Sequence, residues 1–218
     1  MSLLTKERET LVQYGKKLID TGLTVGTGGN ISIFDRESGY MAITPSGLEY
    51  HKLDPKDIVI MDLDGNVVEG NWKPSSEYHM HTLVYKNRED VNAMVHTHAL
   101  YSTTISALNT ELPAIDYLVA HSGGKNVRCA KYAPFGTLEL AENALEAMEG
   151  RNAVLLANHG INVVGTTMKN AFDITEQLEF CARIYWQAKS IGEPVILSDE
   201  EMDNMVDRFK SYGQPKEQ

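Results

Sequence analysis

A hairpin signal limits the folds that are open to this 218-residue chain. The segment DIVIMDLDGNVVEG, residues 57–70, places short apolar runs on either side of Asp64-Gly65. Asp-Gly between such runs is typical of a tight turn that joins antiparallel strands. Two further short apolar segments bounded by glycine, residues 29–34 and 40–47, precede it. We therefore expect a sheet that is mixed or largely antiparallel, not a doubly wound parallel one.

Helical patterns alternate with these strands. Apolar residues recur at helical spacing within residues 3–21, and Gly22 ends that segment. Helices are also expected at residues 74–87, 100–109, 135–150, 167–192 and 198–213, and buried strands within residues 92–99 and 152–165. Interleaved helices and strands predict a three-layer α/β/α fold with the sheet in the middle. Residues 112–135 match neither pattern. Because no repeat or linker interrupts the sequence, we expect one domain over residues 1–218.

The composition argues against several classes of protein. A net charge of −10 is opposite in sign to the basic surface that binds nucleic acid. No apolar run approaches transmembrane length, and the charged N-terminus lacks a signal-peptide core, so we expect a cytoplasmic protein without a membrane partner. Cys129 and Cys181 are too few for a disulfide scaffold and form no CxxC motif. We interpret both cysteines as reduced and structural.

Two histidines end one of the predicted strands. His96 and His98, in VNAMVHTHAL, are two positions apart, and such residues project from the same face of a strand. They are either ligands of one metal ion or polar residues where the strand meets solvent. His159, in LLANHGINVVG, also lies where an apolar strand meets a glycine turn, and Glu77 lies in the first turn of the helix predicted at residues 74–87. Three histidines and one glutamate form a zinc-type ligand set, although spacing alone does not bring them together.

Other histidines serve as controls. His79 and His81 point apart on the predicted helix, so their spacing cannot chelate one ion. His81 lies one turn after Glu77 and is a candidate to support it from behind, whereas His79 is expected on the surface or in packing. His51 and His121 have no local partners.

Three loops rich in glycine and hydroxyl groups lie at residues 27–32, 44–47 and 74–77. Together they offer backbone N–H groups, hydroxyls and one helix N-terminus, which can hold a phosphate without many cations. The sequence lacks a P-loop, and GTGGN lacks the spacing of a dinucleotide-binding fingerprint. A nucleotide site is therefore disfavoured.

Five motifs in this order, GTGGNIS, ITPSG, PSSE, VHTHA and NHG, resemble the class II, metal-dependent sugar-phosphate aldolases of the fuculose-phosphate aldolase and ribulose-phosphate epimerase superfamily. The similarity continues through PAIDYLVAHSGG, CAKYAPFGTLELAE and LSDEEMDNMVDRFKSYG, and thus covers nearly the whole chain. The resemblance implies the class II aldolase fold. One departure is His121, where the resemblance leads us to expect a small residue.

The resemblance also implies a role for each matching residue. One zinc ion per subunit is expected to bind His96, His98, His159 and Glu77, and Glu77 is expected to act as the base as well. Tyr117 is expected to reach a neighbouring subunit's active site as a proton donor, within a cyclic homotetramer whose sites lie at subunit interfaces. The residues expected around the substrate phosphate are Gly29, Asn30, Ser46, Gly47, Ser75 and Ser76, and those on the aldehyde side are Phe135 and Tyr212.

The implied reaction is retro-aldol cleavage of L-fuculose 1-phosphate, or of a related ketose 1-phosphate, to dihydroxyacetone phosphate and L-lactaldehyde. It belongs to fucose metabolism and passes through a metal-stabilised enediolate. Three neutral imidazoles leave the zinc ion its positive charge and an open position for the substrate. Glu77, displaced from the metal, would move the proton at C1 of dihydroxyacetone phosphate.

Three alternatives stay open. A ribulose-5-phosphate 4-epimerase would use the same metal, but the resemblance implies Asp after PSS in epimerases, where this chain has Glu77. Another sugar-phosphate lyase of the superfamily would differ in an aldehyde pocket that one sequence does not reveal. A non-catalytic assembly domain like that of adducin would have lost metal ligands, whereas all four candidates are present here.

Overall fold

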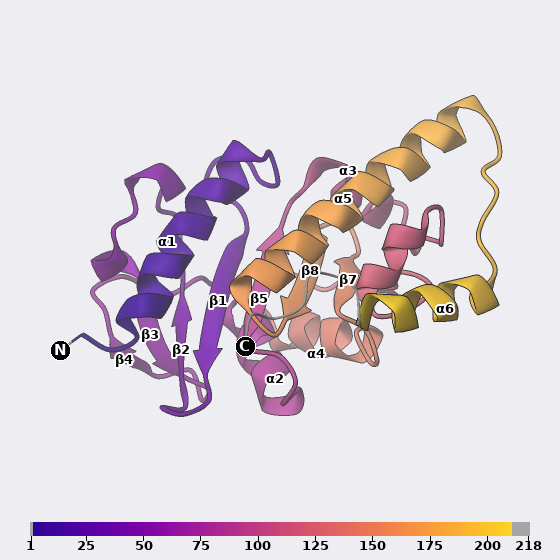
Figure 1. The fold of residues 1–218 in the computed structure, drawn as a ribbon. Coiled ribbons are helices and arrows are strands. Elements are labelled where there is room, and N and C mark those ends of the chain that lie inside the picture. The colour runs from indigo at the N-terminus through magenta and orange to yellow at the C-terminus, as the bar shows by residue number, and fades with distance from the viewer. Residues whose placement is uncertain (1, 211–218) are drawn as a thin grey trace.

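The computed structural model of the chain describes residues 2–210, which form a central eight-stranded sheet (Figure 1). The strands are β1 (Asn30–Asp35), β2 (Tyr40–Ile43), β3 (Val59–Asp62), β4 (Val67–Glu69), β5 (Ala93–Thr97), β6 (Cys129–Ala130), β7 (Ala153–Leu156) and β8 (Gly160–Gly165). Their order across the sheet is β4-β3-β2-β1-β5-β8-β7-β6. β6 and β7 are parallel, and the other neighbours are antiparallel. The predicted mixed, largely antiparallel sheet is confirmed.

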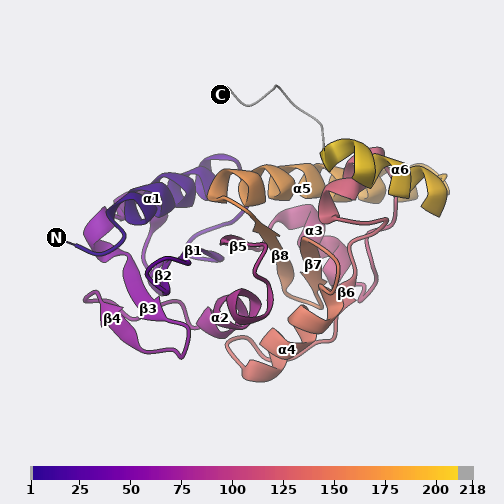
Figure 2. The same cartoon turned by 60° about the horizontal axis from the view of Figure 1, so that its bottom comes forward.

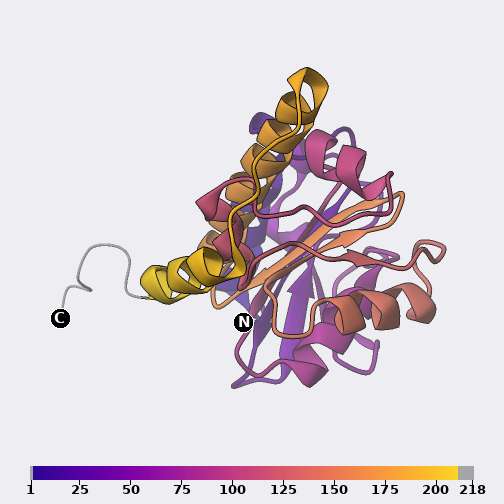
Figure 3. The same ribbon diagram turned by 90° about the vertical axis from the view of Figure 1, so that its right-hand side faces the viewer.

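Helices cover both faces of this sheet, as Figure 2 shows. One layer contains α1 (Thr5–Asp20), α3 (Leu100–Ser106), α5 (Met168–Ile191) and α6 (Asp199–Lys210), and the other contains α2 (Tyr78–Asn87) and α4 (Leu138–Ala147). Short 3-10 segments lie at η1 (Tyr50–Lys52), η2 (Pro55–Asp57) and η3 (Tyr117–Ser122). Figure 3 shows α5 and α6 on one side of the sheet and α4 on the other. The predicted three-layer α/β/α arrangement is confirmed.

The hairpin at Asp64-Gly65 is present between β3 and β4. Its loop spans residues 63–66, and Gly65 has a φ of 94°. The Asp62 carboxylate accepts the N–H groups of Asp64 and Asn66, each at 2.9 Å. These hydrogen bonds stabilise a connecting loop of four residues.

Strand register creates a row of polar side chains on the sheet. Val95 packs beneath α1 and α5, whereas Met94 packs beneath α2 and α4. Because side chains alternate along a strand, His96 faces the α2 side with Met94. The register places His96 opposite Asn30 of β1 on one side and opposite Asn162 of β8 on the other. All three polar side chains are buried, on a sheet face whose other buried residues are mostly apolar.

The helix predicted for residues 74–87 begins later than expected, at Tyr78. Glu77 was expected inside its first turn but occupies the N-cap position with a ψ of 16°. The hydroxyl of Ser75 accepts the N–H of Glu77 at 3.2 Å, and the N–H of Ser75 donates to the oxygen of Thr44. These contacts hold the preceding residues against β2 and delay the helix.

Two other segments differ from the sequence interpretation. The strand expected within residues 92–99 ends at Thr97, so His98 lies one residue beyond it. Residues 112–135, for which no element was predicted, contain η3 and the two-residue strand β6. Neither element is long enough to show a period in the sequence.

The remaining predictions concern termini, thiols and membranes. At the start of α6 the hydroxyl of Ser198 accepts the N–H of Glu201 at 3.2 Å, while the predicted continuation of this helix past Lys210 lies outside the described residues. Cys129 and Cys181 are free, as expected. Within residues 2–210, no helix has both the length and the apolar character needed to cross a bilayer.

Candidate metal and substrate site

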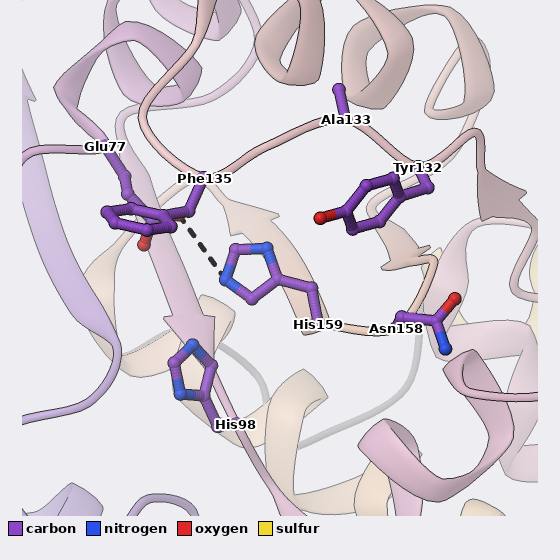
Figure 4. Close-up of a pocket in the computed structure, with 7 residues that line it drawn as sticks. All are labelled: Glu77, His98, Tyr132, Ala133, Phe135, Asn158 and His159. Carbon is purple, nitrogen blue, oxygen red and sulfur yellow. Dashed lines mark ion pairs between the residues drawn. The ribbon is translucent and has the colours of Figure 1, made fainter.

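Four side chains from separate parts of the chain converge at one end of the sheet. His96 ends β5, His98 follows it, His159 lies in the β7–β8 turn, and Glu77 precedes α2. One potential ligand atom from each lies within 4.8 Å of all the others. His96 Nε2 is 3.1 Å from His98 Nε2 and 3.2 Å from Glu77 Oε2. His159 Nε2 is 3.4 Å from Glu77 Oε1, an ion pair drawn in Figure 4. The structure therefore brings together the four residues that the sequence suggested as one ligand set.

The ring of His96 has a defined orientation. Its Nδ1 atom is 2.8 Å from Oδ1 of Asn162 and 3.3 Å from the main-chain oxygen of Ile161. Since the Ile161 oxygen can only accept, Nδ1 carries a hydrogen. The Nε2 atom therefore faces Glu77 and His98 with either a lone pair or a second hydrogen. A cation at Nε2 makes this contact favourable.

Electrostatics match a cation site. Burial would raise the pKa of Glu77, but the charges and hydrogen bonds of His96, His159 and Asn30 outweigh it and lower that pKa to about 2. The Oε1 atom of Glu77 is buried and has no hydrogen-bond partner among residues 2–210. Burial, and then the charge on His96, lowers the pKa of His98 and of His159 to about 4. One carboxylate with an oxygen that accepts no hydrogen bond, together with imidazoles, fits a divalent cation of the zinc type.

Two glycines allow the neighbouring strands to approach the histidines. Gly29 has a φ of 72°, and a Cβ atom there would lie 2.6 Å from the main-chain oxygen of His96. A Cβ atom on Gly160 would collide with the main-chain oxygen of Thr97 and lie 3.2 Å from the ring of His98. Any larger residue at either position would push β1 or β8 away from β5.

A carboxylate on α5 positions the segment after His98. Glu179 accepts the N–H groups of Tyr101 and Ser102, each at 2.8 Å, and the Ser102 hydroxyl at 2.7 Å. It therefore caps the start of α3, directly after the loop that carries His98. Glu179 was not predicted as a site residue, because nothing in its local sequence distinguishes it from a solvent-facing helix residue.

The loops proposed for phosphate binding lie side by side. Pro45 and Pro74 form an isolated antiparallel bridge, and the N–H of Ser46 donates to the oxygen of Lys73. The members of the predicted set that are exposed are Ser46, Gly47 and Ser76; Gly29 is half-buried, and Asn30 and Ser75 are buried. Asn30 donates its side-chain N–H to Glu77 at 3.0 Å, a contact that sequence analysis did not predict.

A cavity of about 280 Å³ opens beside the four converging side chains. Its lining residues are Glu77, His98, Tyr132, Ala133, Phe135, Asn158 and His159 (Figure 4). Phe135 was expected here and is 72% exposed. Tyr132, whose hydroxyl points toward the space beside His159, and Asn158 were missed. The only signal in the sequence is position: Tyr132 lies three residues before Phe135, and Asn158 directly precedes His159.

Tyr117 and Tyr212 were the other two predicted site residues. Tyr117 is 49% exposed on η3, stacks on Phe209 at 6.3 Å, and is not among the residues that line this cavity in the described chain. Tyr212 lies outside the described residues. The fold of this chain therefore does not place Tyr117 in the cavity beside Glu77.

The remaining histidines do not join the cluster. The ring of His79 packs against that of Tyr78 at a tilt of 34°, His51 lies 3.2 Å from Asp20, and His121 stacks on Phe209 at 4.0 Å. His81 is fully buried behind Asn30, as its position one turn after Glu77 suggested.

Residues 9–186 match the protein family described as "Class II Aldolase and Adducin N-terminal domain". This range includes all four converging residues.

Relatives cover nearly the entire chain. A 5-deoxy-D-ribulose 1-phosphate aldolase from Bacillus thuringiensis serovar kurstaki is 58% identical over 212 residues, or 97% of this chain and 99% of the relative. An L-fuculose phosphate aldolase from Escherichia coli K12 is 40% identical over 206 residues, or 91% of this chain and 94% of the relative. A solved structure of an L-fuculose 1-phosphate aldolase has a TM-score of 0.93 at 52% identity and covers 96% of this chain and 98% of its own.

Proposed function

Because the chain belongs to the family of class II aldolases and adducin N-terminal domains, as its motifs indicated, we propose that it cleaves a ketose 1-phosphate into dihydroxyacetone phosphate and a short aldehyde. Its aldolase relatives span almost the full chain, and it is a carbon–carbon lyase of this metal-dependent class. The observation that carries the proposal is the convergence of Glu77 with three histidines beside an open cavity.

We propose 5-deoxyribulose 1-phosphate as the first candidate substrate, because the 58% identical relative is an aldolase of that sugar phosphate. L-fuculose 1-phosphate, which the motifs suggested, is the second candidate, supported by the relatives that carry its name. Retro-aldol cleavage between C3 and C4 releases acetaldehyde from the first and lactaldehyde from the second. Both aldehydes end in a methyl group, and Phe135, Tyr132 and Ala133 offer apolar surface for it.

We propose zinc as the metal, one ion per subunit, bound by Glu77, His96, His98 and His159. Three imidazoles and one carboxylate are donors that zinc prefers. When bound, the cation supplies a Lewis acid for the negative charge that forms beside the ketone.

Glu77 carries the proton chemistry in this proposal. In the cleavage direction, C3 of the ketose becomes the hydroxymethyl carbon of dihydroxyacetone phosphate and must gain a proton. Burial would raise the pKa of Glu77, but the neighbouring His96 and His159 outweigh it and lower that pKa to about 2, so the carboxyl is charged in the metal-free site. When substrate oxygens separate Glu77 from these rings, the effect of burial remains and raises its pKa. Glu77 can then carry the proton to that carbon.

The aldehyde-side oxygen needs its own proton carrier. We propose Tyr117 of a neighbouring subunit, within a cyclic homotetramer, because the tyrosine is exposed and does not line the cavity of its own chain. Tyr132, which does line that cavity, is the competing candidate. Phe135 would form the aldehyde-side wall, and Tyr212 is assigned to the same side by resemblance alone.

For the phosphate group, we propose the paired loops at residues 44–47 and 74–77 with the neighbouring Gly29 and Asn30. Exposed Ser46, Gly47 and Ser76 offer hydroxyl and N–H donors. Asn30 donates one amide hydrogen to Glu77, and we propose that its second amide hydrogen donates to the phosphate. The Ser75 hydroxyl accepts the N–H of Glu77 and thereby positions that residue.

A release assay tests this function. The zinc-loaded protein is incubated with 5-deoxyribulose 1-phosphate, L-fuculose 1-phosphate or L-ribulose 5-phosphate, and dihydroxyacetone phosphate is measured. We expect release from the two ketose 1-phosphates, faster from the first. Epimerisation of the third without release would favour the epimerase alternative, and inactivity on all three would favour an adducin-like role. A single domain over residues 1–218 and a cytoplasmic location stay predictions.

A further inference from the structure

A chain of buried polar side chains runs from Glu77 into the core between β1 and α2. Its members, in order, are Glu77, Asn30, His81, Ser32 and Tyr85. Successive members are joined by hydrogen bonds of 3.0, 2.5, 2.6 and 2.7 Å. None of the five is more than 7% exposed. Burying so many polar groups is costly unless each one is satisfied, so the arrangement requires an explanation.

The residue spacings of helix and strand bring these five side chains into hydrogen-bonding contact. Glu77, His81 and Tyr85 follow at four-residue intervals, roughly 6 Å apart along one stripe of a helix. Asn30 and Ser32 are two residues apart on one face of β1, a spacing of roughly 6.6 Å. The spacings are similar, and the two strand residues therefore lie between successive helix residues.

The hydrogen bonds in this chain have one consistent direction. The charged carboxylate of Glu77 can only accept, so Asn30 donates its Nδ2–H group to it and turns its Oδ1 atom toward His81. Because Oδ1 can only accept, the Nε2 atom of His81 must donate.

The remaining hydrogen bonds of this network follow from a neutral His81 ring. Burial, and then the charge on His96, lowers the pKa of His81 to about 3, so the ring is neutral at pH 7. Its Nδ1 atom therefore accepts, and the Ser32 hydroxyl donates to it. The Tyr85 hydroxyl then donates to Ser32, whose Oγ atom is 2.7 Å away and whose main-chain oxygen is 3.1 Å away.

We infer that His81 is a positioning residue for Glu77: its Nε2–H group holds the Asn30 amide so that an N–H group, and not the carbonyl oxygen, faces the carboxylate. A reversed amide would place its oxygen against Glu77 Oε2, and the repulsion would displace a proposed metal ligand. The inference rests on the proposed function where it treats Glu77 as a metal ligand.

Zinc affinity of the purified full-length chain tests this role. The metal-free protein is titrated with Zn²⁺ in competition with a fluorescent chelator. His81→Leu removes both ring nitrogens, and we expect it to weaken zinc binding about 10- to 100-fold, as loss of a partner behind a metal ligand usually does. His81→Gln retains an amide N–H within reach of Asn30 and should recover most of that loss.

The matched control is His79→Leu. It makes the same substitution on the same helix, at a half-buried ring that packs against Tyr78 and is not among the converging ligands. We expect its zinc affinity to equal that of the wild type. If His81→Leu also binds zinc as tightly as the wild type, the network only packs α2 on β1 and the inference is wrong.

A spectroscopic measurement decides the case even if His81→Leu does not fold. Long-range ¹H–¹⁵N correlation spectra of the metal-free wild type at pH 7 distinguish the histidine tautomers, with the His81 signals assigned by their loss in His81→Gln. We expect a hydrogen on Nε2 and none on Nδ1. A hydrogen on Nδ1 alone, or on both nitrogens, would overturn the inference. Neither readout uses a sugar phosphate, so inactivity on every ketose phosphate would refute the proposed function alone.

Discussion

The Nδ1 atom of His96 lies 2.8 Å from the Oδ1 atom of Asn162, and the two residues are directly paired across β5 and β8. Asn162 also directs its side-chain nitrogen toward the sulfur of Met80, at 3.3 Å. This contact keeps the Asn162 oxygen turned toward His96. Strand register thus determines which ring nitrogen of His96 is presented to Glu77.

Asn162→Leu should weaken zinc binding by about 10- to 100-fold, because the His96 ring loses the acceptor that sets its tautomer and orientation. Asn162→Asp keeps an acceptor at the same place and should bind zinc more tightly than the leucine variant. Competition with a chelator measures both affinities. Equal affinities in the two variants would contradict an orienting role for Asn162.

Glu77→Gln should preserve the fold but suppress exchange of the hydroxymethyl proton of dihydroxyacetone phosphate with solvent. An amide fills the same space as the carboxylate but cannot carry that proton, and loss of a general base slows such a step about 10²- to 10⁴-fold. Proton NMR in deuterated water measures the exchange, and circular dichroism checks the fold. Wild-type exchange in the zinc-loaded variant would show that another group is the base.

Tyr117→Phe should slow cleavage more than it slows that exchange, since the proposed donor acts on the aldehyde-side oxygen. Mixing separates a donor in a neighbouring subunit from one in the same chain. Glu77→Gln and Tyr117→Phe chains are co-refolded or co-expressed, and cleavage is compared with that of each variant alone. If Tyr117 acts on a neighbour, mixed assemblies contain intact sites and regain activity. Tyr132→Phe is the parallel test, and a larger loss there with no recovery on mixing would reassign the donor to Tyr132.

Much of the fold and the ligand set could be predicted from local patterns. The Asp64-Gly65 hairpin signal correctly indicated antiparallel pairing, and the two-residue spacing of His96 and His98 correctly placed them on one side. The convergence of His159 and Glu77 on that pair depends on strand order, which no local pattern encodes. It therefore followed from the family resemblance and not from spacing.

The residues that were missed make contacts between distant segments. Asn162 is a polar residue in a strand whose residues are all buried, and its partner His96 lies 66 positions away. Glu179 looks like any charged helix residue until α5 packs beside α3, 77 and 78 positions from the N–H groups that it accepts. Tyr132 could be assigned to the site only from the cavity that it lines. Such contacts arise from tertiary packing, which local sequence does not report.

Gly160→Ala should destabilise the fold and disturb the zinc site together. The new methyl group would collide with the main-chain oxygen of Thr97 and press on the ring of His98. Overpacking against a backbone that cannot move aside costs about 1–3 kcal/mol of unfolding free energy. Gly192→Ala is the matched control, because a Cβ atom there meets nothing within 4 Å among the described residues. Denaturant unfolding and zinc titration measure the two effects, and a stable Gly160→Ala chain with normal zinc affinity would contradict the predicted close approach.

The stability of the metal-free chain should fall as the pH is lowered from 7 to 5, and His81 should account for part of that fall. Burial lowers the pKa of His81 from 6.5 to about 3, so below pH 6.5 the unfolded chain binds a proton that the folded chain does not. Stability therefore decreases with falling pH, by about 2 kcal/mol at pH 5 for this one group. His98 and His159, with pKa values of about 4, contribute with the same sign. Glu77 does not contribute between pH 7 and pH 5, because its stabilising charge is lost only as the pH falls below 4.5, the ordinary pKa of a glutamate.

His81→Leu isolates this contribution. The variant is expected to be less stable than the wild type at pH 7, yet to lose less further stability between pH 7 and pH 5, since one titrating group is gone. Urea unfolding at both pH values gives the two differences, with His79→Leu as the control that should keep the wild-type slope. An identical pH dependence in His81→Leu and the wild type would mean that His81 takes up its proton in the folded chain as readily as in the unfolded one.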